Sequence, residues 1–292
     1  MSALYDLPAP AKLNLFLHVV GRRPDGYHLL QSVFTLIDWC DTLHVERRAD
    51  GRISREDLGP TLPDDDLCTR AARALQAASG TTLGAHIAID KQVPWGAGLG
   101  GGSSDAATTL IALNRLWGLN WPRSRLLELG LALGADVPFF IGGRNAWVEG
   151  IGEQITPITL PPTTYAVLKP PVAVPTAAIF SSPLLTRDTP RTTMAVFLAD
   201  PKSFGKNDLQ ASAEAYSPQI VDGLEILKQN FGLSRMSGSG SAVFAHCEDL
   251  PQESSARPPI ERVQRLATPG SGWIARHCNG LDCHPLLDWC SD

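Results

Sequence analysis

Two features are missing from this sequence: a long hydrophobic run and a cluster of basic residues. The 292 residues contain no stretch of about 18 consecutive apolar residues, so we expect no membrane-spanning helix. The first apolar stretch, residues 13–20, contains Asn14 and His18, which is atypical of a secretory signal. The net charge is −5 and the lysines and arginines are dispersed, so neither nucleic acid nor an anionic membrane is expected as a partner.

Cysteine is also scarce, and its six positions are scattered. A chain of this size needs no disulfide bonds to fold, so we interpret the cysteines as thiols in a reducing cytoplasm. They are Cys40, Cys68, Cys247, Cys278, Cys283 and Cys290. His277 and His284 lie near the last three, which leaves a zinc cluster open, although the spacing fits none of the common ligand patterns.

The remaining composition is that of a soluble globular protein, with 43% hydrophobic and 19% charged residues. The length favours two domains. Six prolines between positions 157 and 175 interrupt the chain too often for a helix. We therefore place a boundary near residue 160, between a domain of residues 1–160 and one of residues 161–292.

Residue patterns predict both strands and helices. Strict alternation over residues 12–19 predicts a strand that places Lys12 and Asn14 on the same face. A turn at residues 23–26 and further strands at 33–39, 42–47, 86–90 and 242–246 follow from the same reasoning. Apolar stripes and end signals predict helices over 67–78, 106–117, 123–133 and 218–231, with Ser103 and Ser104 capping the second. Residues 251–259 are expected to form a surface loop.

The strongest functional signal is a glycine-rich run, residues 96–102, that leads directly into a predicted helix. Such a junction binds phosphate, because glycine lets backbone N–H groups converge on an anion and the helix dipole adds partial positive charge. Gly96, Gly98 and Gly101 also match a dinucleotide fingerprint, but no second strand with a terminal acidic residue follows. The run lacks the Gly-Lys-Ser/Thr ending of a Walker A loop, and a plain turn remains an alternative.

Three separated motifs together resemble the GHMP kinase superfamily. They are Pro10-Ala11-Lys12-Leu13-Asn14-Leu15, the run from Pro94 to Ala107, and Met236-Ser237-Gly238-Ser239-Gly240-Ser241. Within the superfamily the chain is most similar to the kinases of 4-diphosphocytidyl-2-C-methyl-D-erythritol, through Gly26-Tyr27-His28, residues 134–140, Pro175-Thr176 and Phe180.

The resemblance implies an α+β fold of two lobes, the first similar to ribosomal protein S5 domain 2 and the second a ferredoxin-like α/β sandwich. It implies transfer of the ATP γ-phosphoryl group to the 2-hydroxyl of the cytidyl substrate in non-mevalonate isoprenoid biosynthesis. Magnesium is expected from that chemistry and not from any visible ligand cluster. A small cytidyl diphosphate is the expected partner, and the enzyme is expected to be a cytoplasmic monomer or homodimer.

The resemblance also assigns roles to individual residues. It makes Asp136 the base and Lys12 the neighbouring cation. It places ATP at Lys91, Pro94, Gly96, Gly98, Leu99, Gly100, Gly101, Gly102, Ser103, Ser104 and Asp105. It places the substrate at Asn14, Tyr27, His28, Thr176, Phe180, Gly238, Ser239 and Gly240. The chain departs from the family at Asp65-Asp66-Leu67, where an asparagine would contact adenine.

Simpler interpretations stay open for several of these residues. Asp136 could be a turn residue before an extended Val137-Pro138 pair, and Lys12 a solvent-exposed lysine at a strand end. Asn14 could cap a neighbouring strand, the aromatic residues could pack in the core, and residues 238–241 could form a tight turn. At the level of function, the alternatives are a kinase for another alcohol, such as mevalonate or homoserine, and a non-catalytic nucleotide sensor.

Overall fold

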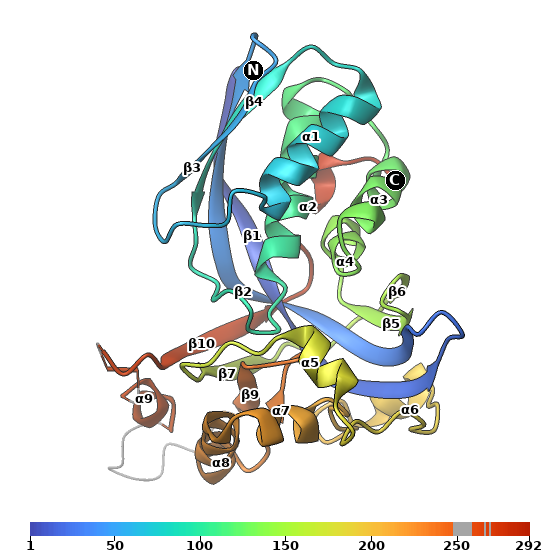
Figure 1. Cartoon of the computed structure of the whole chain (residues 1–292), viewed down its shortest axis with the longest axis vertical. Helices are drawn as coiled ribbons and strands as arrows, with labels where there is room; N and C mark the ends of the chain where they lie inside the picture. The colour runs from blue at the N-terminus through green and yellow to red at the C-terminus, as the bar shows by residue number, and fades with distance from the viewer. Residues whose placement is uncertain (248–258, 266, 269) are drawn as a thin grey trace.

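The computed structural model describes residues 1–247, 259–265, 267, 268 and 270–292, and these form two lobes (Figure 1). β1 (Ala3–Arg22) and β2 (His28–Arg48) run from the upper lobe into the lower one, and β3 (Ile53–Asp57) and β4 (Gly84–Asp90) complete the sheet of the upper lobe. Four helices cover one face of this sheet: α1 (Leu67–Ser79), α2 (Gly101–Leu116), α3 (Arg123–Leu133) and α4 (Val137–Gly142). A hairpin of β5 (Ala146–Gly150) and β6 (Gln154–Pro157) pairs with β2.

The lower lobe is built on β7 (Thr164–Lys169), β8 (Arg235–Met236), β9 (Val243–Cys247) and β10 (Ile274–Leu281). Its helices are α5 (Thr176–Ser181), α6 (Met194–Ala199), α7 (Gln210–Tyr216), α8 (Pro218–Phe231) and α9 (Pro259–Gln264). β10 pairs along most of its length with β7, and its last two residues pair with β2 at Ile37 and Leu36. The two lobes thus share one sheet, whose path runs β3-β4-β2-β10-β7-β9-β8.

The predicted α+β class is confirmed, as are the helices near residues 67–78, 106–117, 123–133 and 218–231. The boundary near residue 160 falls between β6 and β7 and stays a prediction. The predicted loop at 251–259 lies outside the described residues except for Pro259, which begins α9.

Three local predictions are wrong. The strands predicted at 33–39 and 42–47 form one strand, β2, because β1 pairs with it along nearly its whole length. Strict alternation in β1 fails at a bulge between Asn14 and Phe16, so Phe16 joins the same buried cluster as Leu13. Ser103 and Ser104 do not cap α2; they lie inside its first turn, and Gly100 is the cap residue with a φ of 72°.

Candidate active site

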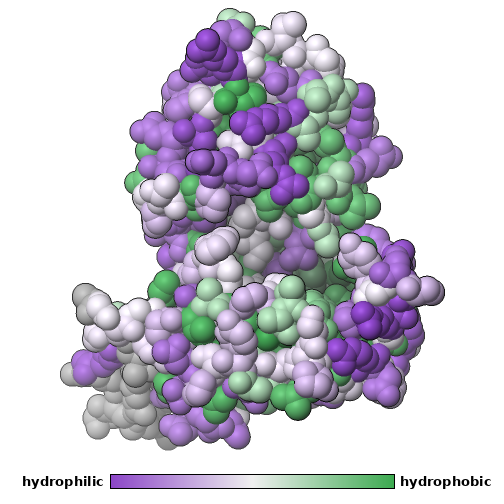
Figure 2. All heavy atoms as spheres, viewed as in Figure 1, coloured by the Kyte–Doolittle hydropathy of each residue, from purple (hydrophilic) through white to green (hydrophobic). Residues whose placement is uncertain are grey.

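A cleft of about 320 Å³ lies between the lobes, where the surface is visibly hollowed (Figure 2). Both lobes contribute to its walls, so its shape depends on how they pack. Residues from the three sequence motifs meet there with Asp136, at the start of α4, and with residues of α5. The predicted site residues that line it are Lys12, Asn14, Gly96, Gly98, Gly100, Asp136, Thr176, Phe180, Gly238, Ser239 and Gly240.

Lys12 and Asp136 face each other across this cleft. The Lys12 Nζ atom lies 3.5 Å from Oδ2 of Asp136 and 2.5 Å from Oδ1 of Asn14, and 4.6 Å from the centre of the Phe34 ring. Burial lowers the pKa of Lys12, and the charge of Asp136 opposes that shift. The strand-end interpretation of Lys12 is wrong, because only 3% of the residue is exposed.

Asn14 extends this polar chain beneath the cleft. Its Nδ2 group donates to Oγ of Ser32 at 3.0 Å, and Ser32 donates to the carbonyl oxygen of Phe16. The side-chain oxygen of Asn14 is thereby turned toward Lys12, since the amide nitrogen is already used. Asn14 therefore holds the ammonium group of Lys12 at the cleft wall.

Asp136 occupies the N-cap position of α4. Pro138 lies in the first turn of that helix, so Val137 and Pro138 are helical and the alternative of an extended pair is wrong. The Asp136 side chain is 32% exposed, which leaves an oxygen accessible from the cleft while Lys12 contacts the other. This placement suits a carboxylate that accepts a proton from a bound hydroxyl.

The two glycine-rich loops touch each other through their backbones. The Ser237 hydroxyl donates to the carbonyl oxygen of Gly98 at 2.9 Å and accepts from the backbone N–H of Asn14 at 3.1 Å. A Cβ atom on Gly98 would lie 2.1 Å from the carbonyl oxygen of Ser237. Glycine is therefore required at position 98 by close approach as well as by its φ of 74°.

The start of α2 is suited to bind phosphate. Its first helical residues are Gly101 and Gly102, and no side chain of the described residues caps the backbone N–H groups of the first turn. Those N–H groups and the positive end of the helix dipole form an anion site next to Gly98 and Gly100. The predicted phosphate loop thus has free donors where ATP phosphates would need them.

Lys91 and Asp105 form an ion pair beside this loop. The Lys91 ammonium lies 2.7 Å from Oδ2 of Asp105 and also contacts Asp41, whose other oxygen accepts from the N–H groups of Gln92 and Val93. The side chains of Lys91 and Asp105 are nearly fully buried, as are Leu99 and Ser104. Direct contact of these side chains, and of Pro94 and Ser103, with ATP stays a prediction.

Aromatic and hydroxyl groups from the lower lobe form the opposite wall. The Thr176 hydroxyl hydrogen-bonds that of Ser239 at 2.9 Å, which joins α5 to the second glycine loop. The Phe180 ring stacks on His28, with ring centres 5.1 Å apart and an angle of 29°. Tyr27 is 61% exposed, and neither Tyr27 nor His28 lines the cleft itself. They lie at its edge, so their contact with substrate stays a prediction.

Sequence reasoning missed several residues of the cleft. Ser32 and Phe34 reach it because β2 pairs with β1, and Ala135, Ile151 and Gly152 reach it from the turns beside α4 and β5. No local motif marks these positions. Only the register of β1 against β2 places Ser32 and Phe34 next to Asn14, and no local sequence pattern reveals that register.

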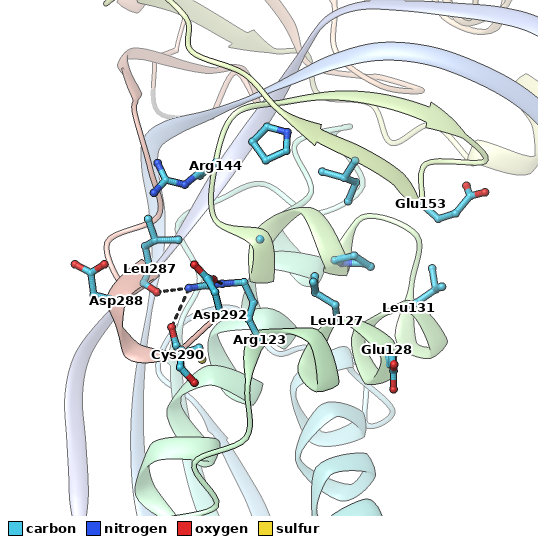
Figure 3. A pocket seen from close by; sticks show the side chains of 15 residues that line it. Arg123, Leu127, Glu128, Leu131, Arg144, Glu153, Leu287, Asp288, Cys290 and Asp292 are labelled. Carbon is cyan, nitrogen blue, oxygen red and sulfur yellow. Dashed lines mark hydrogen bonds and ion pairs between the residues drawn. The ribbon is translucent and has the colours of Figure 1, made fainter.

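A larger cavity of about 720 Å³ shares no lining residue with the cleft. Figure 3 shows it between α3, α4, β6 and the C-terminal residues, with Arg123 at its wall. Arg123 donates to the carbonyl oxygens of Ile141, Leu287 and Cys290 at 2.7–3.0 Å. The groups expected for phosphoryl transfer are in the smaller cleft, so we assign the reaction there.

The C-terminal cysteines and histidines do not form a metal site. Among the described residues, no three His, Cys, Asp or Glu side chains are arranged to hold a metal ion. His284 is buried, and this burial lowers its pKa to about 4; its Nδ1 accepts from the N–H of Leu286. The imidazole is therefore a neutral packing group. All six cysteines are free.

Asp66, one of the residues at which this chain departs from the family pattern, has a structural role. Its carboxylate accepts from the N–H groups of Cys68 and Thr69 and so caps α1, and it pairs with Arg55. Its oxygens are thus already used within the protein.

Comparisons with known proteins identify the family of this chain. The model of the GHMP kinases N terminal domain matches residues 66–144, and that of the GHMP kinases C terminal domain matches residues 195–262. A 4-diphosphocytidyl-2-C-methyl-D-erythritol kinase of Methylibium petroleiphilum is 63% identical over 99% of both chains. The chain belongs to the GHMP kinase family.

Two further relatives of this GHMP kinase carry the same enzyme name. The Paracidovorax citrulli protein is 56% identical over 100% of this chain and 99% of its own. A crystal structure of a 4-(cytidine 5'-diphospho)-2C-methyl-D-erythritol kinase, 34% identical, superposes with a TM-score of 0.77 and covers 94% of this chain and 99% of its own. No helix among the described residues is long and apolar enough to span a membrane.

Proposed function

We propose that this kinase transfers the γ-phosphoryl group of ATP to the 2-hydroxyl of 4-diphosphocytidyl-2-C-methyl-D-erythritol, a step of the methylerythritol phosphate route to isoprenoid precursors. The observation that carries the proposal is the Lys12–Asp136 pair in a cleft bounded by two glycine loops. The enzyme name of the relatives, and the Phe180–His28 stack at the edge of the cleft, support the cytidyl substrate.

Asp136 would accept the proton of the substrate hydroxyl as the oxygen attacks phosphorus. Lys12, held by Asn14, would keep the carboxylate ionised and stabilise charge on the entering oxygen. The N–H groups at the start of α2 would bind ATP phosphates, and Gly238 to Gly240 would close the cleft beside the transferred group. Catalysis then rests mainly on position and charge.

Magnesium fits this site only as a partner of ATP. Asp136 is the single carboxylate among the residues that line the cleft, and Asp105 is already paired with Lys91. Magnesium usually keeps several waters and is held by one or two carboxylates plus substrate phosphates. The ATP phosphates and water would supply most of its ligands, and the metal would neutralise the charge of the phosphates.

Two other readings of the site are less well supported. In a GHMP kinase for mevalonate or homoserine, the aromatic stack at His28 would be incidental. A nucleotide sensor would not need the buried Lys12 opposite Asp136. We further propose that the enzyme acts in the cytoplasm as a monomer or homodimer, without a nucleic acid or membrane partner.

The decisive experiment is ATP consumption by the purified protein with magnesium and the cytidyl substrate, beside Asp136→Asn. We expect turnover by the parent and a loss of about 10²–10⁴-fold in kcat in the variant, with ATP affinity retained. Asp222→Asn, at an exposed position of α8, is the matched control and should leave kcat unchanged. Failure of the parent to use this substrate while it binds ATP would refute the assignment.

A further inference from the structure

Arg187, which follows α5, contacts both residues of the aromatic stack, the ring of His28 and the backbone of Phe180. Its Nε group lies 3.3 Å from Nε2 of His28. Its Nη2 group donates to the carbonyl oxygens of Phe180 at 3.2 Å and Ser182 at 3.0 Å, and Nη1 donates to that of Leu185 at 3.0 Å. The guanidinium therefore connects the start of β2 to the segment that carries Phe180.

This contact determines which nitrogen of His28 carries the proton. A guanidinium has only donors and stays protonated, so Nε2 of His28 must be the acceptor and Nδ1 must carry the hydrogen. Burial and the charges of Arg187 and of Arg22 on β1 lower the pKa of His28, which favours the neutral ring. Among the described residues Nδ1 takes part in no hydrogen bond, so its N–H is not used within the protein.

We propose that Arg187 is a positioning residue that presents His28 as an Nδ1–H donor beside Phe180, so that the site selects a pyrimidine with an acceptor at N3. Cytosine has a lone pair at N3, whereas uracil carries a hydrogen there, so the fixed tautomer favours cytosine. This inference rests on the proposed function, since it concerns the base of the same substrate. Arg187 acts through His28 and Phe180, and it need not touch the substrate.

The first test measures the tautomer directly and needs no ligand. Long-range ¹H–¹⁵N spectra of the protein labelled at histidine distinguish a proton-bearing ring nitrogen from one with a lone pair, and His28→Gln assigns the signals. We expect the proton on Nδ1 in the parent and a mixture of tautomers in Arg187→Met. A proton on Nε2 of His28 in the parent would overturn the proposal.

The second test measures discrimination between CDP and UDP by calorimetry from pH 6 to pH 8. The ratio of the UDP and CDP dissociation constants cancels the titration of the phosphate groups, which the two ligands share. We expect a constant ratio in the parent and a ratio about tenfold lower in Arg187→Met at pH 8, where the wrong tautomer is accessible. As the pH falls toward 6, protonation returns a hydrogen to Nδ1, and the ratio of the variant should rise.

Two variants separate this role from a merely structural one. Arg187→Lys should restore part of the ratio, because an ammonium group also donates and never accepts. Arg191→Met is the control on the same segment, since Arg191 pairs with Glu149 at the surface, and it should leave the ratio unchanged. A ratio in Arg187→Met that equals that of the parent at every pH would refute the role of Arg187. A parent that binds neither CDP nor UDP would instead refute the cytidyl substrate, whatever tautomer His28 adopts.

Discussion

At the scale of single residues, Lys12 and Asp136 differ sharply in environment. Lys12 is almost completely buried, whereas the Asp136 side chain is 32% exposed. A buried ammonium is costly unless it is paired, and here Asn14 and Asp136 are the partners that offset part of that cost. Asn14 and Asp136 thus favour the ammonium form of Lys12, whereas burial favours the neutral amine. The titration of Lys12 should therefore be observable.

The alkaline side of the pH profile of kcat/KM should report that titration, because kcat/KM reflects the groups of the free enzyme. Burial lowers the pKa of Lys12 below the ordinary lysine value of 10.5, so the ammonium loses its proton at a lower pH than an exposed lysine. We expect kcat/KM to fall as pH rises through a midpoint below 10.5, because the neutral amine no longer supports Asp136. Steady-state kinetics at substrate concentrations well below KM measure it.

The matched comparison uses Lys12→Arg. Its guanidinium stays protonated over the same range, so any residual activity should lack this alkaline decrease. A decrease with the same midpoint in both proteins would assign the titration to another group. Circular dichroism at each pH separates titration from unfolding.

At the scale of elements, the contact between the two glycine loops is the most restrictive feature of the site. Gly98→Ala would bring Cβ to 2.1 Å from the Ser237 carbonyl oxygen and would strain a φ of 74°. Gly118→Ala, at a φ of 67° with no atom within 4 Å of its Cβ, has the backbone strain alone.

The pair of variants isolates the loop contact. We expect Gly118→Ala to cost about 1–2 kcal/mol of unfolding free energy in urea and to leave the KM for ATP unchanged. Gly98→Ala should cost more and should raise that KM at least about tenfold, because the displaced loop no longer presents its N–H groups. Equal effects of the two substitutions on KM would show that the loops do not depend on each other.

Elements with strong local signals were predictable, and those set by distant pairing were not. The boundaries of α3 and the end of α1 at Gly80 follow from apolar stripes and end residues. The single strand β2 was predicted as two, since its continuity depends on its pairing with β1. Likewise, Lys12, Asp136 and the glycine loops were found from motifs, whereas Ser32 and Arg187 became visible only through contacts between segments far apart in sequence.

At the scale of the whole molecule, the C-terminal segment connects the lobes. β10 pairs with β7 in the lower lobe and then with β2 in the upper one, and the chain ends against α3 (Figure 1). Arg123 holds that end, because its guanidinium donates to carbonyl oxygens of Leu287 and Cys290 (Figure 3) and to that of Ile141, in α4. One buried side chain thus anchors both the C-terminus and the helix that begins after Asp136.

Arg123→Met should therefore weaken stability and catalysis together. It leaves three carbonyl oxygens without their donor, each of which costs about 1–3 kcal/mol when buried, so we expect a clear drop in the urea midpoint. Because α4 also loses a contact at its C-terminal end, kcat should fall more than the KM for ATP rises. Asp292→Asn removes only the exposed partner of Arg123 and should change neither midpoint nor kcat. A loss of stability with an unchanged kcat in the folded Arg123→Met protein would mean that α4 holds Asp136 in place without the C-terminal segment.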